Sequence, residues 1–176
     1  LVTLYQHLMD RKEGFDMDAI GEDVFFLSNG HISPVFYSVL ARSGYFPVSE
    51  LATFRLLNSR LQGHPTTHEG LPGVRMASGS LGQGLSVANG MALGLKLQNK
   101  KNRVYVAMGD GELQEGQVWE AAMTAAHYKL DNLVAIIDYN NLQIDGKVSD
   151  VMGVLPITDK FKSFNWNVIE IDGHSY

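Results

Sequence analysis

Two polar residues in the second half of the chain follow apolar runs, and their types suit metal and phosphate chemistry. Asp110 stands between two glycines in the stretch MGDGELQEG (108–116), and Asn140 comes soon after the apolar run 132–138. If both runs are neighbouring parallel strands, a carboxylate and a carboxamide meet at one edge of a sheet. With a backbone carbonyl just past Asn140, they offer the hard oxygen ligands that Mg²⁺ or Ca²⁺ prefers.

The glycines beside these residues favour an anionic ligand. Gly109 and Gly111 allow the backbone to turn sharply and approach a ligand closely. A helix is expected to begin near Glu115, where its free N–H groups attract anions. A second glycine-rich stretch, SGSLGQG (78–84), also opens a helix, although alone it is a weak signal. The chain contains neither G-x-G-x-x-G nor G-x-x-x-x-G-K-[ST], which argues against a nicotinamide enzyme and a P-loop nucleotidase.

Alternating strands and helices must position these residues. The patterns predict helices over 85–98, 115–130 and 158–164, and strands over 103–108, 132–138 and 166–171. Earlier in the chain they predict a helix over 1–12, a short strand within 13–33, and helical segments over 34–41 and 48–58. Strands that alternate with helices of this length predict a doubly wound α/β domain, in which a mostly parallel sheet carries helices on both faces.

Composition narrows the class of protein. The 176 residues are 45% hydrophobic, enough for one packed domain. A formal charge of −5 gives no reason to expect nucleic acid or an anionic membrane as a partner. The absence of cysteine excludes disulfides and thiolate metal sites, and a cytoplasmic location is the default. No apolar run approaches the ~20 residues of a membrane helix, so the chain is expected to be soluble.

The motifs resemble one family of thiamine-dependent enzymes. Gly109-Asp110-Gly111, followed by Asn140-Asn141, is similar to the thiamine-diphosphate-binding motif of these enzymes. The segments LSNGHISPVFY (27–37), LQGHP (61–65) and SGSLGQGLSVANGMALG (78–94) resemble the N-terminal, diphosphate-binding domain of transketolase. This resemblance implies that residues 1–176 form a single domain of the thiamine-diphosphate-binding fold, incomplete at both ends relative to the family.

The resemblance also implies which residues bind the cofactor. Asp110, Asn140 and the main-chain carbonyl of Leu142 are expected to hold Mg²⁺, for which Ca²⁺ is a possible substitute. The residues expected beside thiamine diphosphate are His31, Gly79, Leu81, Gly109, Asp110, Gly111, Asn140, Leu142 and Ile144. Among them, Gly79 and Leu81 are expected to contact the aminopyrimidine, and Ile144 to pack near the thiazolium.

Three residues receive catalytic roles from the same resemblance. His31 is expected near the diphosphate and the substrate, and His64 is expected to face the hydroxyl groups of the donor sugar. Imidazole titrates near neutral pH and therefore suits the proton transfers of this chemistry. Glu115 is expected to join a carboxylate network across a subunit interface.

A transketolase transfers a two-carbon ketol unit from a ketose phosphate to an aldose phosphate, as in the pentose phosphate pathway. In this family the glutamate that activates the aminopyrimidine belongs to a second domain, and no segment of this chain matches it. A pyrimidine-binding domain or a C-terminal subunit is therefore expected as a partner, within a homodimer or a heterotetramer. Variant ketoses, including modified sugars, remain possible donors.

Other interpretations remain open at this stage. The nearest enzyme alternatives are a deoxyxylulose-phosphate synthase and the alpha subunit of a 2-oxo-acid dehydrogenase. A cofactor-binding subunit without catalytic activity of its own is a further alternative. A loop histidine such as His64 is often only solvated, and His68 is interpreted as a loop residue. Gly90 and Gly94, four residues apart in an expected helix, are expected to permit close helix packing.

Overall fold

A parallel sheet of three strands forms the centre of the fold. The computed structural model describes residues 1–18, 21–144 and 146–175. The strands lie in the order β1-β2-β3 and comprise β1 (Val24–Leu27), β2 (Val104–Gly109) and β3 (Leu133–Asp138). Val104 is aligned with Val24 on one side and with Leu133 on the other. The predicted parallel α/β class is confirmed.

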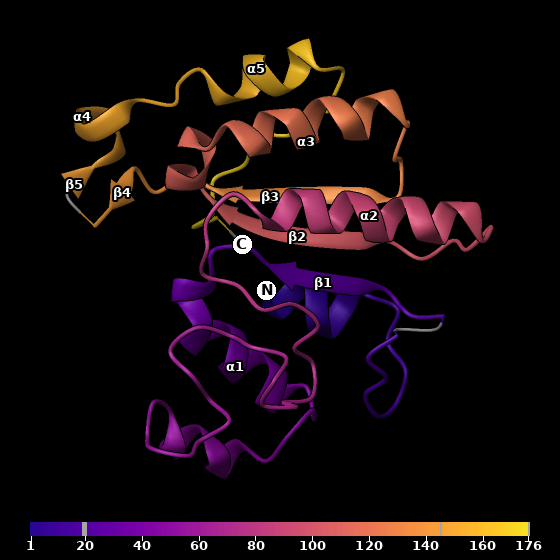
Figure 1. The fold of residues 1–176 in the computed structure, drawn as a ribbon, viewed down its shortest axis with the longest axis vertical. Helices are drawn as coiled ribbons and strands as arrows, with labels where there is room; N and C mark the ends of the chain where they lie inside the picture. The colour runs from indigo at the N-terminus through magenta and orange to yellow at the C-terminus, as the bar shows by residue number, and fades with distance from the viewer. Residues whose placement is uncertain (19–20, 145, 176) are drawn as a thin grey trace.

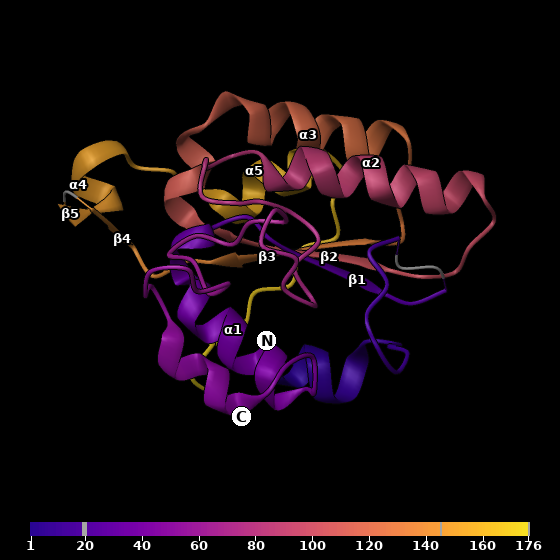
Figure 2. The ribbon, with the colours of Figure 1, turned by 60° about the horizontal axis from the view of Figure 1, so that its bottom comes forward.

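Helices cover both faces of this sheet (Figure 1). One face carries α2 (Gly84–Leu97), α3 (Gly116–His127) and α5 (Ile157–Ser163). The opposite face carries α1 (Ser33–Arg42), which Figure 2 shows from a second direction. Within the described ranges, no helix is both long and apolar enough to cross a membrane.

The two faces of the strands enclose two separate cores because side chains alternate along a strand. Val104 and Val106 point into the core beneath α2 and α3, and both are fully buried. Tyr105 packs into the other core, together with Phe25 and with Tyr37 of α1. Each strand of the centre is thus held from both sides, as a parallel sheet requires.

Shorter elements connect these layers. They are η1 (Leu4–Leu8), η2 (Gly30–Ile32), η3 (Val48–Thr53), η4 (Asp110–Gln114), β4 (Leu142–Gln143), β5 (Gly146–Lys147) and α4 (Val148–Met152). The strands β4 and β5 pair antiparallel as a small hairpin that extends from the end of β3 (Figure 1). The sequence patterns predict neither this hairpin nor α4, because both are too short to show a period.

Three expected elements differ from the structure. The predicted helices over 1–12 and 48–58 shrink to η1 and η3. The predicted strand over 166–171 is wrong, since this segment belongs to no sheet. Its alternation is real, because Trp166 and Val168 pack against the core while Ile169 is 78% exposed. Alternation fixes which side chains turn inward, but a strand also needs a neighbour to pair with.

The chain leaves the ends of β1 and β2 in opposite directions. After β1 it passes through η2 into α1 on one face, and after β2 it passes through η4 into α3 on the other face (Figure 2). Such a divergence leaves a crevice at the carboxyl ends of the two strands, and open α/β sheets bind ligands there. The predicted site residues lie at this edge.

Candidate functional site

Asp110 and the segment around Asn140 meet at the carboxyl edge of the sheet, as predicted. β2 and β3 are neighbours, with Gly109 aligned to Asp138. Asp110 is 2% exposed, and its Oδ2 accepts a hydrogen bond of 2.7 Å from the N–H of Asn141. Its Oδ1 accepts the N–H of Gly111 at 2.8 Å. One carboxylate therefore ties the turn after β2 to the turn after β3.

The donor set at this edge suits a hard cation. Asn140 Oδ1 accepts the N–H of Leu142 at 2.8 Å, which folds the chain back towards the carbonyl of Leu142. Asp110 is buried, and no ion pair with a basic side chain balances it among the residues that the structure describes. Within the same residues, no three His, Cys, Asp or Glu side chains cluster as metal ligands. A magnesium ion here would rely on one carboxylate, neutral oxygens, phosphate and water.

Two further loops close on this edge through glycines. A Cβ atom at Gly30 would lie 2.6 Å from the carbonyl carbon of Ser78, so the turn before His31 touches the 78–84 loop directly. Gly79 has a φ of +127°, and a Cβ there would lie 2.7 Å from Cδ2 of His64. The structure therefore brings His31, His64 and Gly79 together from three segments. Both histidines are exposed and open to a ligand.

Unpaired buried polar atoms lie beside these loops. Asn29 Oδ1 and Ser78 Oγ are buried without a hydrogen-bond partner in the described part of the chain. Such atoms are rare in native structures, and a ligand or water usually completes their bonding. Asn29 is absent from the predicted site residues, although it follows β1 as Asn140 follows β3. Glu112 is absent as well, since no sequence pattern distinguishes this buried acid from a surface one.

The segment before His64 is fixed by two side chains of α1. Ser33 Oγ donates to the carbonyl of Gly63 at 2.7 Å, and the Tyr37 hydroxyl donates to the carbonyl of Gln62 at 3.0 Å. Burial raises the pKa of Tyr37 to about 12, so its hydroxyl remains a donor at neutral pH. The histidine therefore projects from an anchored loop.

The other predicted residues lie at the rim. The side chain of Glu115 lies against Gly82, because a Cβ added at Gly82 would be 2.7 Å from Cβ of Glu115. Leu81 is partly exposed, and the side chains of Leu142 and Ile144 are in solvent. The structure does not bring Ile144 against the other predicted residues. Its predicted contact with the thiazolium would require the cofactor or another chain to reach the hairpin.

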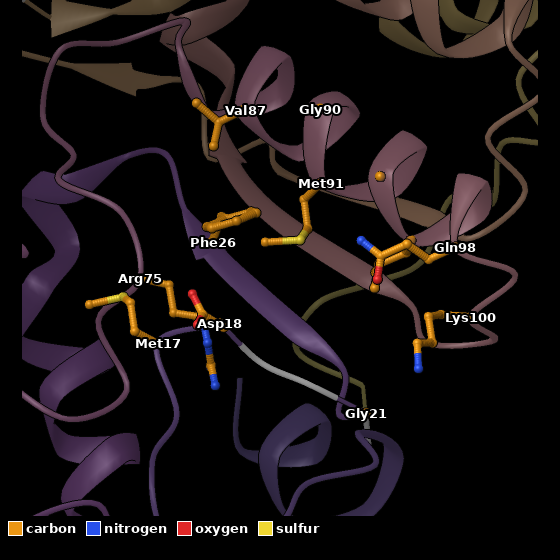
Figure 3. Close-up of a pocket in the computed structure, with 12 residues that line it drawn as sticks. Met17, Asp18, Gly21, Phe26, Arg75, Val87, Gly90, Met91, Gln98 and Lys100 are labelled. Atoms are coloured by element: carbon orange, nitrogen blue, oxygen red, sulfur yellow. The ribbon is translucent and has the colours of Figure 1, made fainter.

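A cavity of about 480 Å³ lies away from these residues, between α2, β1 and the segment around Met17 (Figure 3). None of the predicted site residues lines it. Gly90 and Gly94 of α2 form part of its wall, and a Cβ at either would meet nothing within 4 Å. The expectation that these two glycines permit close helix packing is therefore wrong within this chain.

Comparison with known proteins identifies the family. The family model described as "Transketolase, thiamine diphosphate binding domain" matches residues 2–176. The structure is similar to that of transketolase from Campylobacter jejuni, with a TM-score of 0.88 and 33% identity over 99% of this chain and 28% of that one. The fold predicted from the motifs is confirmed.

Several curated relatives are subunits of a divided enzyme. One of two apulose-4-phosphate transketolase subunits of this kind, from Actinobacillus succinogenes, is 44% identical over 99% of this chain and 62% of its own length. A 6-deoxy-6-sulfo-D-fructose transketolase subunit from Clostridium sp. is 44% identical over 87% of this chain and 55% of its own. The transketolase of Pongo abelii is 43% identical over 99% of this chain, which spans only 28% of that protein.

Proposed function

The chain belongs to the transketolase family, within its thiamine-diphosphate-binding domain, and from this premise we propose that it supplies the diphosphate and metal half of a transketolase active site. The observation that carries the proposal is the buried carboxylate of Asp110, which joins the turns after β2 and β3 at the carboxyl edge of the sheet. Asp110, Asn140 and the Leu142 carbonyl would hold Mg²⁺. Gly109 and Gly111 would leave room for the diphosphate.

When bound, thiamine diphosphate supplies the nucleophilic carbon that cleaves a C–C bond of a ketose phosphate and carries the two-carbon unit to an aldose phosphate. The protein residues orient the reactants and handle protons. His64, held against Gly79, would accept a proton from a donor hydroxyl, and His31 would bind near the phosphate groups. Gly79 and Leu81 would border the aminopyrimidine, and Glu115 would lie at a subunit contact.

The proposed reaction needs a second protein component. The chain spans 55% and 62% of the subunit-type relatives and a smaller part of the undivided transketolase. We propose that a pyrimidine-binding domain or C-terminal subunit supplies the activating glutamate, within a homodimer or a heterotetramer. The relatives are named for different ketoses, so donor tests should include 6-deoxy-6-sulfo-D-fructose and apulose 4-phosphate beside pentose phosphates.

Calorimetric titration with thiamine diphosphate, with and without Mg²⁺, tests the metal and cofactor assignment. We expect magnesium-dependent binding to the wild-type protein and none to Asp110→Ala. Asp159→Ala is a matched control, because Asp159 is exposed on α5 and distant in sequence from these turns. Binding should be measured with the partner component present, so that every group of the proposed site is supplied. Magnesium-dependent binding that survives in Asp110→Ala would refute the assignment.

A further inference from the structure

Glu112 is a buried acid that the proposed reaction does not use. Its side chain lies in η4 and is 1% exposed. Its Oε1 accepts hydrogen bonds from the Ser28 hydroxyl at 2.5 Å and from the Gly82 N–H at 2.9 Å. Its Oε2 accepts the N–H of Gly109 at 2.9 Å. Three segments far apart in the sequence thus donate to a single carboxylate.

These three donors begin or end the segments that form the crevice. Ser28 comes directly before Asn29, Gly30 and His31. Gly82 follows the Gly79 to Leu81 stretch, and Gly109 precedes Asp110. The spacing between the histidine turn, the aminopyrimidine loop and the metal turn therefore depends on the position of one side chain.

The contact extends to the start of α2. Ser28 Oγ, which donates to Glu112, also accepts the N–H of Gly84 at 3.1 Å. The backbones approach so closely here that a Cβ at Gly84 would lie 2.3 Å from Cβ of Ser28. A carboxylate, a hydroxyl and three backbone N–H groups therefore form one connected network.

The charge of Glu112 has no balancing cation. No ion pair to it is present among the residues that the structure describes. Taking a carboxylate out of water is costly unless its oxygens are well hydrogen-bonded. The three donors satisfy Glu112, and the ionised acid is the form that can accept all of them at once, because a carboxylate has only acceptors.

A glutamine at this position cannot reproduce the network. With its amide nitrogen in place of Oε2, it would direct a donor at the N–H of Gly109. In the flipped orientation the nitrogen would face the N–H of Gly82. The Ser28 hydroxyl can rotate to accept, but a backbone N–H cannot, so either orientation leaves one buried N–H without an acceptor.

From this geometry we infer that Glu112 is a positioning residue of the cofactor crevice, which holds the loops of His31, Gly79 and Asp110 at the spacing that thiamine diphosphate requires. The inference rests on the proposed function. It predicts that loosening the network weakens cofactor binding even in folded protein, since binding must then also order the loops.

The test uses the full-length protein with its partner component and compares Glu112→Gln, Ser28→Ala and the control Glu13→Gln. Glu13 is exposed and lies in the segment before β1. The dissociation constant for thiamine diphosphate at saturating Mg²⁺ is measured well below the unfolding temperature. We expect it to rise about tenfold for Glu112→Gln, a loss on the scale of one charge-assisted hydrogen bond, less for Ser28→Ala, and not at all for the control.

Amide hydrogen exchange in the cofactor-free protein gives a second measurement. Protection of the Gly82 and Gly109 amides should fall in Glu112→Gln while protection in β2 and α3 is retained. A folded Glu112→Gln protein with the wild-type dissociation constant would overturn the inference, because a purely structural role lowers stability alone. If Glu112→Gln does not fold, an unchanged constant in Ser28→Ala overturns it instead. Wild-type protein that binds no thiamine diphosphate would refute the proposed function itself, a distinct result.

Discussion

Replacing Gly84 by alanine should strongly destabilise the protein, although glycine is normally the poorer residue in a helix. The added Cβ would lie 2.3 Å from Cβ and 3.0 Å from Cα of Ser28, where ordinary contacts begin at 3.4 Å. The start of α2 would have to move away from β1 by about 1 Å. That shift would also stretch the Gly84 N–H to Ser28 hydrogen bond of 3.1 Å.

The expected magnitude follows from these two effects. Overpacking costs about 1–3 kcal/mol and the weakened hydrogen bond about 1 kcal/mol, so the free energy of unfolding should fall by about 2–4 kcal/mol. At about 2–4 °C per kcal/mol for a domain of this size, the Tm should fall by roughly 5–15 °C. Gly90→Ala in the same helix provides the opposite case, because a Cβ there meets nothing within 4 Å. Its Tm should rise by about 1–4 °C through the gain in helix propensity.

The assay is thermal unfolding of the wild type and both variants, followed by circular dichroism at equal protein concentration. Opposite signs for the two substitutions would support the close approach of α2 to the end of β1. A Gly84→Ala protein as stable as Gly90→Ala would refute the reasoning, because identical changes in one helix would then have no dependence on their surroundings.

Three other predictions test the site. Gly79→Ala forces a side chain to φ +127° and against the His64 ring, so kcat/KM for ketose donors should fall at least tenfold in a coupled activity assay. The pKa of Tyr37 is raised to about 12, so its neutral form stabilises the fold fully below pH 10, and this contribution is lost as pH rises through 12. Denaturant unfolding should show wild type losing up to about 2–3 kcal/mol more than Tyr37→Phe between pH 9 and 12, and equal losses would contradict it. Removing Mg²⁺ with a chelator should lower the Tm of cofactor-loaded wild type but leave Asp110→Ala unchanged.

The sequence predicts the sheet and the metal turn better than it predicts the rest of the site. The predicted strands 103–108 and 132–138 agree within one residue with β2 and β3, because buried parallel strands are continuous apolar runs. Asp110 is located from the strand that precedes it. The expected strand over 166–171 fails, since pairing depends on a neighbour that local pattern does not contain.

Glu112 and Asn29 illustrate why the remaining site residues escape prediction. The partners of Glu112 at Ser28 and Gly82 are 84 and 30 residues away along the chain. No local period encodes such a contact, and a glutamate in a polar turn usually lies on the surface. The role of Gly84 is equally hidden, because only the fold shows which backbone it must approach.

The separation of β1 from β2 along the chain has a consequence for the order of assembly. Val24 pairs with Val104, and Val104 with Leu133, so the sheet edge exists only after more than a hundred residues have been made. Such distant pairings form slowly, because a long loop must close before any contact offsets its entropy. During synthesis, the turn of Asn141 that hydrogen-bonds Asp110 is also late to emerge. A nascent chain would therefore be unable to capture metal or diphosphate piecemeal, and cofactor loading becomes a step that follows completion of the domain.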